Sequence, residues 1–181
     1  MITLGILADT HIPDRVRKLD LKVLSIFRRA GVQAILHAGD VSIPGVLEQL
    51  GELAPVYAVQ GNRDWVRLGS LPRSINLTFG GVQIGMTHGH GTWRNYMVDK
   101  AYYAVEGLQP DRYLRRLLAA FPSARVIIFG HLHLPLNAWF GNQLLFNPGS
   151  ACCPGKKHPF RSIGLLYIDE KSAVEAEIIH L

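Results

Sequence analysis

The sequence has 181 residues but only two cysteines, and these are neighbours, Cys152 and Cys153. Adjacent cysteines cannot close a loop of useful length, so a disulfide scaffold is excluded and two reduced thiols are expected. No apolar run approaches the roughly 18 residues of a membrane span. The apolar start, residues 1–8, has no basic flank and leads into Asp9, unlike a secretory signal. We therefore expect a cytoplasmic protein without a membrane partner.

Charge is also scarce, since charged residues make up 18% of the chain and the net charge is +5 with histidine neutral. The basic residues occur in separate pairs, such as Arg28-Arg29, and not in one stripe, so stable nucleic-acid binding is not expected. Apolar residues make up 48%, which is a globular composition. The length predicts a single domain over 1–181.

Short apolar runs alternate with helical spacing in the first third of the chain. Strands are predicted at 2–8, 34–38 and 55–60, and helices at 19–30 and 44–53. The order strand, helix, strand, helix, strand predicts an α/β layered fold with parallel pairing.

Hairpin signals replace this alternation in the second half, where Gly80-Gly81 and Gly141-Asn142 each separate two strand-like runs. Helical spacing runs from Asn95 to Phe121 with a break around 107–110, and the whole stretch 91–121 is a candidate helical lid. Two packed sheets with helices outside are therefore predicted. The remaining strands are expected at 74–79, 82–86, 125–129, 136–140, 144–146, 163–168 and 174–179.

Five polar clusters interrupt this pattern, each where a predicted strand ends. Taken singly they are weak signals, because an Asp or His at a strand end is more often a turn former or a helix cap. As a set they put carboxylates, imidazoles and an amide at the carboxyl ends of successive strands, where α/β sheets carry their sites. The clusters are Asp9-Thr10-His11, Gly39-Asp40, Gly61-Asn62-Arg63-Asp64, His88-Gly89-His90 and Gly130-His131-Leu132-His133.

The mixture of side chains selects a kind of metal centre. Aspartate with neutral imidazole suits Mn, Fe, Zn, Co or Ni better than Mg or Ca, which prefer oxygen ligands. The candidates are too many for one tetrahedral ion and suit two ions roughly 3.5–4 Å apart with a bridging carboxylate. Two divalent ions, two aspartates and a hydroxide leave one positive charge, which favours an anionic, phosphoryl-containing substrate. The seven candidates are Asp9, His11, Asp40, Asn62, His88, His131 and His133.

In this order the clusters resemble the calcineurin-like metallophosphoesterase superfamily, whose pattern is D-x-H, GD, GN-x-D, a mid-chain histidine motif and GH-x-H. The runs from Thr87 to His90 and from Asn147 to Ser150 resemble its small bacterial and archaeal phosphodiesterase branch. The resemblance covers nearly the whole chain. It implies an α/β fold, a four-layer α/β/β/α sandwich of two mixed sheets flanked by helices.

The same resemblance implies a role for each candidate. Asp9, His11 and His133 would hold one metal ion, with manganese the favoured metal. Asn62, His88 and His131 would hold the other, and Asp40 would bridge. The implied nucleophile is a bridging hydroxide that attacks phosphorus in line.

The chain departs from the superfamily at Arg63, because many of its phosphatases carry a histidine directly after the GN pair, proposed to protonate the leaving group. Arg63 is predicted to contact substrate phosphate, since a guanidinium suits phosphate oxygens; an arginine on a surface turn is the alternative. Asn62 and His90 are the other candidate catalytic and substrate-binding residues. His90 would supply a proton, touch the substrate or support a ligand. Without a strong acid, diesters with leaving groups of low pKa should react best.

Three functions compete. A metal-dependent phosphodiesterase acting on a small phosphodiester leads, because all seven ligand positions are present. A non-catalytic interaction scaffold is the alternative, since the retromer subunit of eukaryotes shares the implied fold and has substitutions at metal positions. A phosphomonoesterase is the third possibility, but it would usually need the acid histidine after the GN pair, which this chain lacks. The sequence leaves the physiological substrate open, and general frequency alone favours a homodimer.

Overall fold

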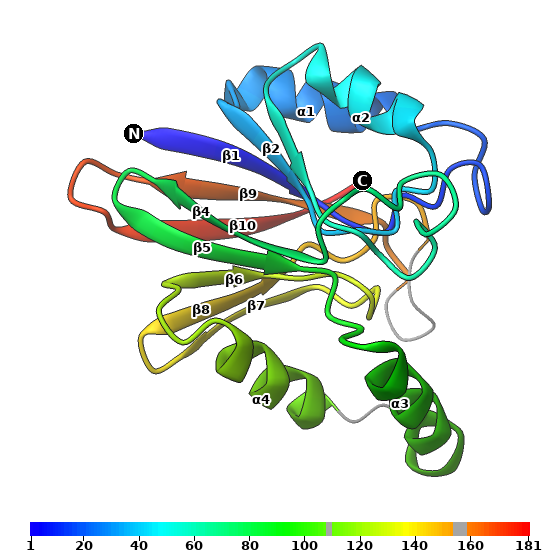
Figure 1. The fold of residues 1–181 in the computed structure, drawn as a ribbon. Coiled ribbons are helices and arrows are strands. Elements are labelled where there is room, and N and C mark those ends of the chain that lie inside the picture. Colours follow the sequence, from blue (N-terminus) through cyan, green and yellow to red (C-terminus); the bar gives the residue numbers. More distant parts are fainter. Residues whose placement is uncertain (108–109, 154–158) are drawn as a thin grey trace.

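Two five-stranded sheets are stacked face to face between helices in the computed structural model, which describes residues 1–107, 110–153 and 159–181 (Figure 1). The first sheet contains β1 (Ile2–Leu7), β2 (Ala34–His37), β3 (Val56–Ala58), β9 (Ser162–Ile168) and β10 (Val174–His180). The second sheet contains β4 (Ser74–Phe79), β5 (Val82–Thr87), β6 (Val126–Ile128), β7 (Leu136–Phe140) and β8 (Gln143–Asn147). The predicted pair of mixed sheets is confirmed.

Each sheet has three parallel strands with antiparallel strands beside them. The first sheet runs β10-β9-β1-β2-β3, with β1, β2 and β3 parallel. The second runs β4-β5-β6-β8-β7, with β5, β6 and β8 parallel. The last two strands of the chain therefore return to the first sheet, where β9 pairs antiparallel with β1.

The described residues form four helices outside the sheets: α1 (Leu21–Ala30), α2 (Pro44–Gly51), α3 (Trp93–Glu106) and α4 (Pro110–Ala120). Figure 1 shows α1 and α2 against the first sheet, α4 beneath the second, and α3 beyond the ends of its strands. The break predicted around 107–110 falls partly on residues 108–109, which lie outside the described residues. Within the described ranges, no helix is long and apolar enough to cross a bilayer.

Strand alternation divides the apolar residues among three cores. On β6, Val126 and Ile128 enter the core between the sheets, whereas Ile127 packs under α4. On β1, Leu4 and Ile6 face the same central core. Because successive side chains of a strand point to opposite faces, this pattern produces layers.

The first sheet and α1 fit closely because of two glycines. A Cβ on Gly5 would lie 2.9 Å from the ring of Phe27, so Phe27 packs directly on the β1 backbone. Gly31 ends α1 with a φ of 61°, a conformation that glycine adopts without strain. At the other end, the Asp20 side chain accepts a hydrogen bond from the Lys22 N–H.

The element boundaries differ slightly from those predicted. The helix α3 begins at Trp93, two residues earlier than expected, and the Thr92 hydroxyl accepts a hydrogen bond from the Asn95 N–H. The helix α2 ends at Gly51 and β3 spans three residues.

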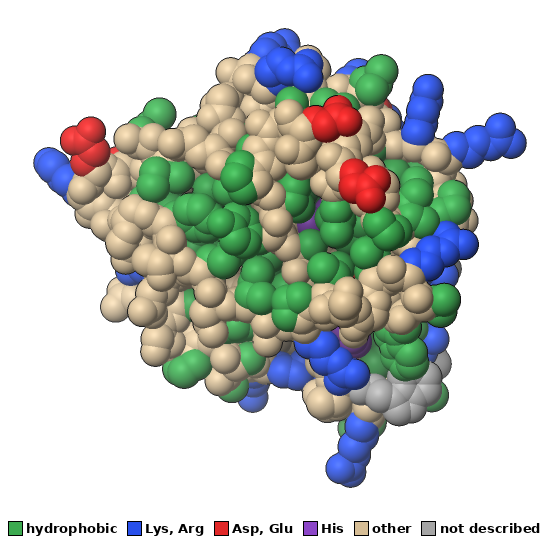
Figure 2. Space-filling model, turned by 45° about the horizontal axis from the view of Figure 1, so that its top comes forward, with side chains coloured by type: hydrophobic (Ala, Val, Ile, Leu, Met, Phe, Trp, Pro, Cys, Tyr) green, Lys and Arg blue, Asp and Glu red, His purple; other side chains and the backbone are tan. Residues whose placement is uncertain are grey.

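The parallel strands of both sheets end on one side of the molecule, where the loops carry the polar clusters (Figure 1). On the face in Figure 2, Lys and Arg side chains stand at separate places.

Candidate active site

The site loops are tightly bent, and five of the predicted ligands have left-handed backbone conformations. This region is uncommon for residues other than glycine and is concentrated at functional sites. The loops after β1, β2 and β6 therefore hold their polar side chains in fixed, strained positions. The five φ angles are 54° at Asp9, 47° at His11, 55° at Asp40, 71° at His131 and 51° at His133.

Close approach between these loops depends on glycine. A Cβ on Gly130 would lie 2.9 Å from both the Ala38 carbonyl oxygen and Asp9 Oδ2. A Cβ on Gly61 would collide with the backbone nitrogen and Oδ1 of Asp40. Gly130 of the GH motif thus allows loops from the two sheets to meet, and Gly61 of the GN motif allows the loops after β2 and β3 to meet.

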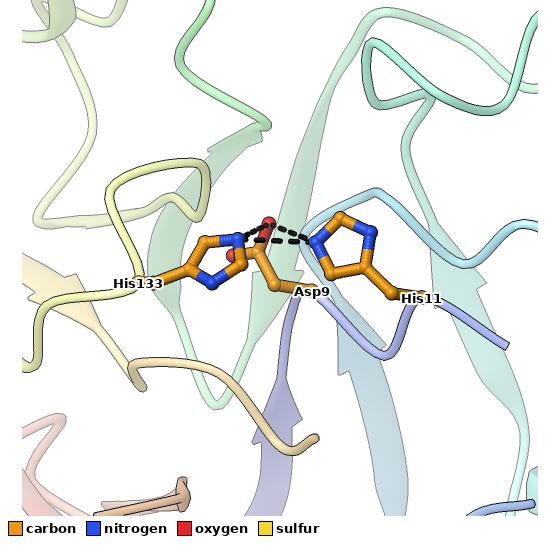
Figure 3. Close-up of side chains that lie close together, drawn as sticks. All are labelled: Asp9, His11 and His133. Carbon is orange, nitrogen blue, oxygen red and sulfur yellow. Dashed lines mark hydrogen bonds and ion pairs between the residues drawn. The ribbon is translucent and has the colours of Figure 1, made fainter. Parts of the chain in front are cut away.

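Asp9, His11 and His133 form the first group of ligand atoms (Figure 3). Asp9 Oδ1 lies 3.3 Å from His133 Nε2 and 3.7 Å from His11 Nε2, and the two nitrogens are 3.0 Å apart. His133 Nδ1 donates to the Cys153 carbonyl at 2.6 Å, so Nε2 is the atom it presents to the group. Three donor atoms thereby converge on one point.

Asp9, Asp40 and His88 form the second group. His88 Nε2 lies 3.5 Å from Asp40 Oδ2, 4.0 Å from Asp9 Oδ1 and 3.2 Å from Asn62 Oδ1. His88 Nδ1 donates to the Ala38 carbonyl at 2.7 Å, which fixes the ring with Nε2 toward the carboxylates. Asn62 therefore adds a fourth donor atom beside this group.

The two groups are contiguous, because Asp9 belongs to both and Asp40 faces both. Asp40 Oδ2 lies 3.8 Å from His11 Nε2 in addition to its approach to His88. Its other oxygen accepts a hydrogen bond from the Arg63 N–H at 2.8 Å. The arrangement supplies two carboxylates between two sets of imidazoles.

Buried carboxylates make this site favourable for positive charge. Burial alone would raise the pKa of Asp9 and Asp40, but the nearby histidines, His133 at Asp9 and His88 at Asp40, hold both below their usual value. Burial likewise would lower the pKa of His88, yet Asp40 and Asp9 raise it to about 9. The site therefore holds two ionised carboxylates, and it carries a proton on His88 at neutral pH.

The residues present fit divalent transition-metal ions. Asp9 Oδ1 is a buried atom that lacks a hydrogen-bond partner among the described residues, which is costly unless a cation compensates it. Carboxylate oxygens, imidazole nitrogens and an amide oxygen are suitable ligands for such ions. The donor set thus supports the metal chemistry predicted from the sequence.

His131 lies outside both groups, although its loop is tied to them. Its backbone N–H donates to Asp9 Oδ2 at 2.9 Å, and its ring centroid is 5.1 Å from that of His88. Burial lowers its pKa to about 3, with a further contribution from the charge of His88, so the ring is neutral. A neutral imidazole next to His88 is compatible with a ligand role.

His90 and Arg63 flank the site. The His90 ring centroid is 5.4 Å from that of His88, and burial, followed by the charge of His88, lowers its pKa to about 4. His90 is therefore a neutral imidazole beside the ligand groups at neutral pH. The Arg63 guanidinium is exposed at the rim, where Nη1 lies 3.9 Å from Asp14 Oδ2.

Asp64 organises the loops, a role that its place in the sequence did not predict. Its carboxylate is fully buried and accepts backbone N–H bonds from Asp40 at 2.9 Å, Ser42 at 2.7 Å and Gly61 at 2.7 Å. The Ser150 hydroxyl similarly donates to the Asp9 carbonyl at 2.7 Å. The only sequence signal for Asp64 was its place in the GN-x-D motif.

Comparison with known proteins gives a consistent result. The profile of the calcineurin-like phosphoesterase superfamily domain matches residues 2–171. A "Probable metallophosphoesterase" of Methanothermobacter thermautotrophicus is 36% identical over 176 residues, which cover 97% of this chain and 91% of that protein.

Solved structures share the fold at low sequence identity. A Vps29 variant from Entamoeba histolytica superposes with a TM-score of 0.74 at 21% identity and covers 99% of both chains. A structure described as a novel archaeal phosphodiesterase superposes with a TM-score of 0.65 at 24% identity and covers 98% of this chain and all of the other. These two likenesses concern the fold alone.

Proposed function

This chain belongs to the calcineurin-like phosphoesterase superfamily, and we propose that it hydrolyses phosphodiesters with two divalent metal ions. The observation that carries the proposal is the pair of contiguous ligand groups that share Asp9. Each offers an aspartate and at least one imidazole nitrogen, and together they bring five side chains to one buried place. A single group of ligand atoms would support a proposal of one ion only.

The proposed roles are those that the family resemblance implies. Asp9, His11 and His133 would hold one ion, Asn62, His88 and His131 the other, and Asp40 would bridge. Two divalent cations held there would activate a water molecule and neutralise phosphoryl charge. Among the divalent transition metals, we propose manganese as the bound metal.

The groups around the ligands would bind and orient the phosphate. The Arg63 guanidinium is exposed at the rim and can form paired hydrogen bonds with phosphate oxygens. The neutral His90 imidazole can contact a substrate oxygen without adding charge. Asp64 would position Asp40 and Gly61 through its bonds to their N–H groups.

A diester is preferred to a monoester because of the residue that follows Asn62. Arg63 occupies that position and cannot serve as a general acid, since a guanidinium stays protonated in proteins. The reaction would then depend on leaving groups that depart without a donated proton. The described archaeal phosphodiesterase shares the fold, which agrees with this choice.

A non-catalytic scaffold is the second candidate, and one observation favours it. The structures that share this fold include Vps29 as well as the archaeal phosphodiesterase, so the fold by itself does not select the enzyme. The presence of all seven ligand positions in this chain favours the enzyme.

Hydrolysis of two chromogenic esters separates these functions. Purified protein is treated with chelator, dialysed and assayed with and without Mn²⁺ on bis(p-nitrophenyl) phosphate and p-nitrophenyl phosphate. We expect Mn²⁺-dependent hydrolysis with a higher kcat/KM for the diester. Faster turnover of the monoester would support a phosphomonoesterase, and no turnover of either ester would support the scaffold.

Two carboxylate variants make the assay specific to the site. Asp40→Ala should abolish the Mn²⁺-dependent rate. Glu48→Ala, which removes an exposed carboxylate from α2, should leave the rate unchanged. Activity that survives in Asp40→Ala after chelation would exclude the proposed mechanism.

A further inference from the structure

An ion pair outside the ligand groups joins α3 and α4 to the loop between two site histidines. Arg116 Nη2 on α4 donates to the Gly89 carbonyl at 2.9 Å and to Asp99 Oδ2 on α3 at 2.9 Å. The Asp99 side chain is 5% exposed and that of Arg116 is 26% exposed. A buried, charge-assisted contact of this kind fixes the groups that it joins.

The Asp99 carboxylate is also linked to His131, because Tyr113 lies between them. Burial, and then the nearby charge of Asp99, raise the pKa of the Tyr113 hydroxyl to about 12, and the Arg116 guanidinium lies 4.9 Å from the centroid of the Tyr113 ring. The Tyr113 ring centroid is 6.0 Å from that of His131. Asp99 is thus connected both to the backbone beside His88 and to the ring of His131.

These contacts reach one set of proposed ligands selectively. His88 and His131 are both assigned to the second ion, and both lie within this network. His133, assigned to the first ion, is held from elsewhere by its bond to the Cys153 carbonyl. The first group therefore has a support that the network does not supply, although the His131 N–H also bonds to Asp9 Oδ2.

The loop at Gly89 needs such a support. Gly89 has a φ of 99°, so the chain bends between His88 and His90 at a residue with unusual backbone freedom. Arg116 holds the carbonyl of that residue, which restricts the loop. Because His88 Nε2 must face Asp9 and Asp40, a loosened loop would spread the positions of this atom.

We propose that Asp99, Arg116 and Tyr113 are positioning residues that hold His88 and His131 for the second metal ion. This inference rests on the proposed function, because it presumes two ions. It assigns to the α3–α4 segment a part in metal affinity in addition to its place as an outer layer. Loss of such supporting contacts typically weakens metal affinity by about 10- to 100-fold.

Calorimetric titration of the metal-free protein with Mn²⁺ tests the inference without using activity. Wild type should bind two equivalents. The double variant Asp99→Asn/Arg116→Met removes the bond to Gly89 without leaving an unpaired buried charge. One of its two binding events should weaken by about 10- to 100-fold while the other keeps its wild-type affinity.

A matched control is Arg115→Met, which removes the neighbouring exposed guanidinium and should titrate like wild type. Circular dichroism establishes whether each variant unfolds cooperatively. Should the double variant fail to fold, Asp99→Asn alone is titrated, because the partly exposed Arg116 can then be hydrated.

The outcomes separate the two proposals. Absence of Mn²⁺ binding by wild type would overturn the proposed function itself. Two events in wild type and two unchanged events in the folded variant would overturn the positioning role alone. Equal weakening of both events would also overturn it, because it would indicate a general structural effect.

Discussion

Among single residues, the carboxylates of Asp9 and Asp40 decide the electrostatics of the site. Both are buried and ionised, and both lie within 4.0 Å of imidazole nitrogens from more than one loop. Protons and metal ions therefore compete for the same histidines. His88 and His133, whose pKa values are raised, are the residues at which that competition is sharpest.

Metal binding at the second group should release a proton at neutral pH. His88 has a pKa of about 9 and is protonated at pH 7, whereas a metal ligand must be neutral. Affinity should then fall about tenfold for each pH unit below about 9, for one displaced proton. Calorimetry at pH 7 in two buffers of different ionisation enthalpy measures the release, and identical heats in both would contradict it.

Removal of the rim guanidinium should weaken substrate binding more than chemistry. Arg63→Ala is expected to raise KM for bis(p-nitrophenyl) phosphate about tenfold, the effect of one lost hydrogen bond to a charged group. Arg67→Ala removes an exposed arginine from the same loop and should change neither constant. Steady-state kinetics with Mn²⁺ measures both, and unchanged kcat and KM in Arg63→Ala would eliminate the contact.

The sequence was sufficient to predict which residues gather at the site, but not which of their atoms contact one another. Strand-end clusters were sufficient to predict that Asp9, Asp40 and His88 converge, because parallel strands end at one edge. The sharing of Asp9 between the groups could not be predicted, since it depends on loop conformations with positive φ. The role of Asp64 could not be predicted for a related reason, because its hydrogen-bond partners are backbone N–H groups of two different loops.

At the scale of elements, caps and close contacts fix where helices begin and how they pack. The helix α1 starts at the Asp20 cap, ends at Gly31 and buries Phe27 against Gly5. These signals are local, and the sequence predicted this helix closely. The tie between α3 and α4 is not local, because Asp99 and Arg116 meet only through tertiary packing, so no sequence pattern indicated it.

Loss of the α1 cap should destabilise the fold in a pH-dependent way. Asp20→Ala should lower the free energy of unfolding by about 1 kcal/mol at pH 7, whereas Asp20→Asn keeps a capping acceptor and most of the stability. The Lys22 N–H, then Arg161, hold the Asp20 pKa below 3.8, although slight burial opposes them.

A lowered pKa means that the stabilisation from the charged Asp20 is present above 3.8 and is lost as pH falls through the folded-state value. The stability difference between wild type and Asp20→Ala should therefore shrink under acid. Urea unfolding at pH 7 and at about pH 3 measures this. A difference that stays constant with pH would contradict the charge contribution.

For the whole molecule, the central core between the sheets fixes the distance between the two sets of loops. Asp9, His11 and Asp40 follow strands of the first sheet, whereas His88 and His133 follow strands of the second. The site therefore exists only while the sheets are packed together. Strand order and hairpin signals predicted two packed sheets with helices outside, but not that β9 and β10 return to pair beside β1.

Phe146 is the side chain whose loss should test this packing. It is fully buried on β8, and its ring packs against Gly164 on β9 of the other sheet. Phe146→Ala should reduce the free energy of unfolding by about 3–5 kcal/mol, and Phe146→Leu by less. Urea denaturation measures both, and a loss below about 1 kcal/mol in Phe146→Ala would show that the sheets do not depend on this contact.

Two cations on the shared carboxylates are the central claim, and anomalous scattering at the manganese edge tests it most directly. In crystals grown with Mn²⁺, we expect two anomalous peaks about 3.5–4 Å apart. One should lie beside His11 and His133, and the other beside His88 and Asn62, with Asp40 between them. A single peak, or none among these residues, would contradict the dinuclear account.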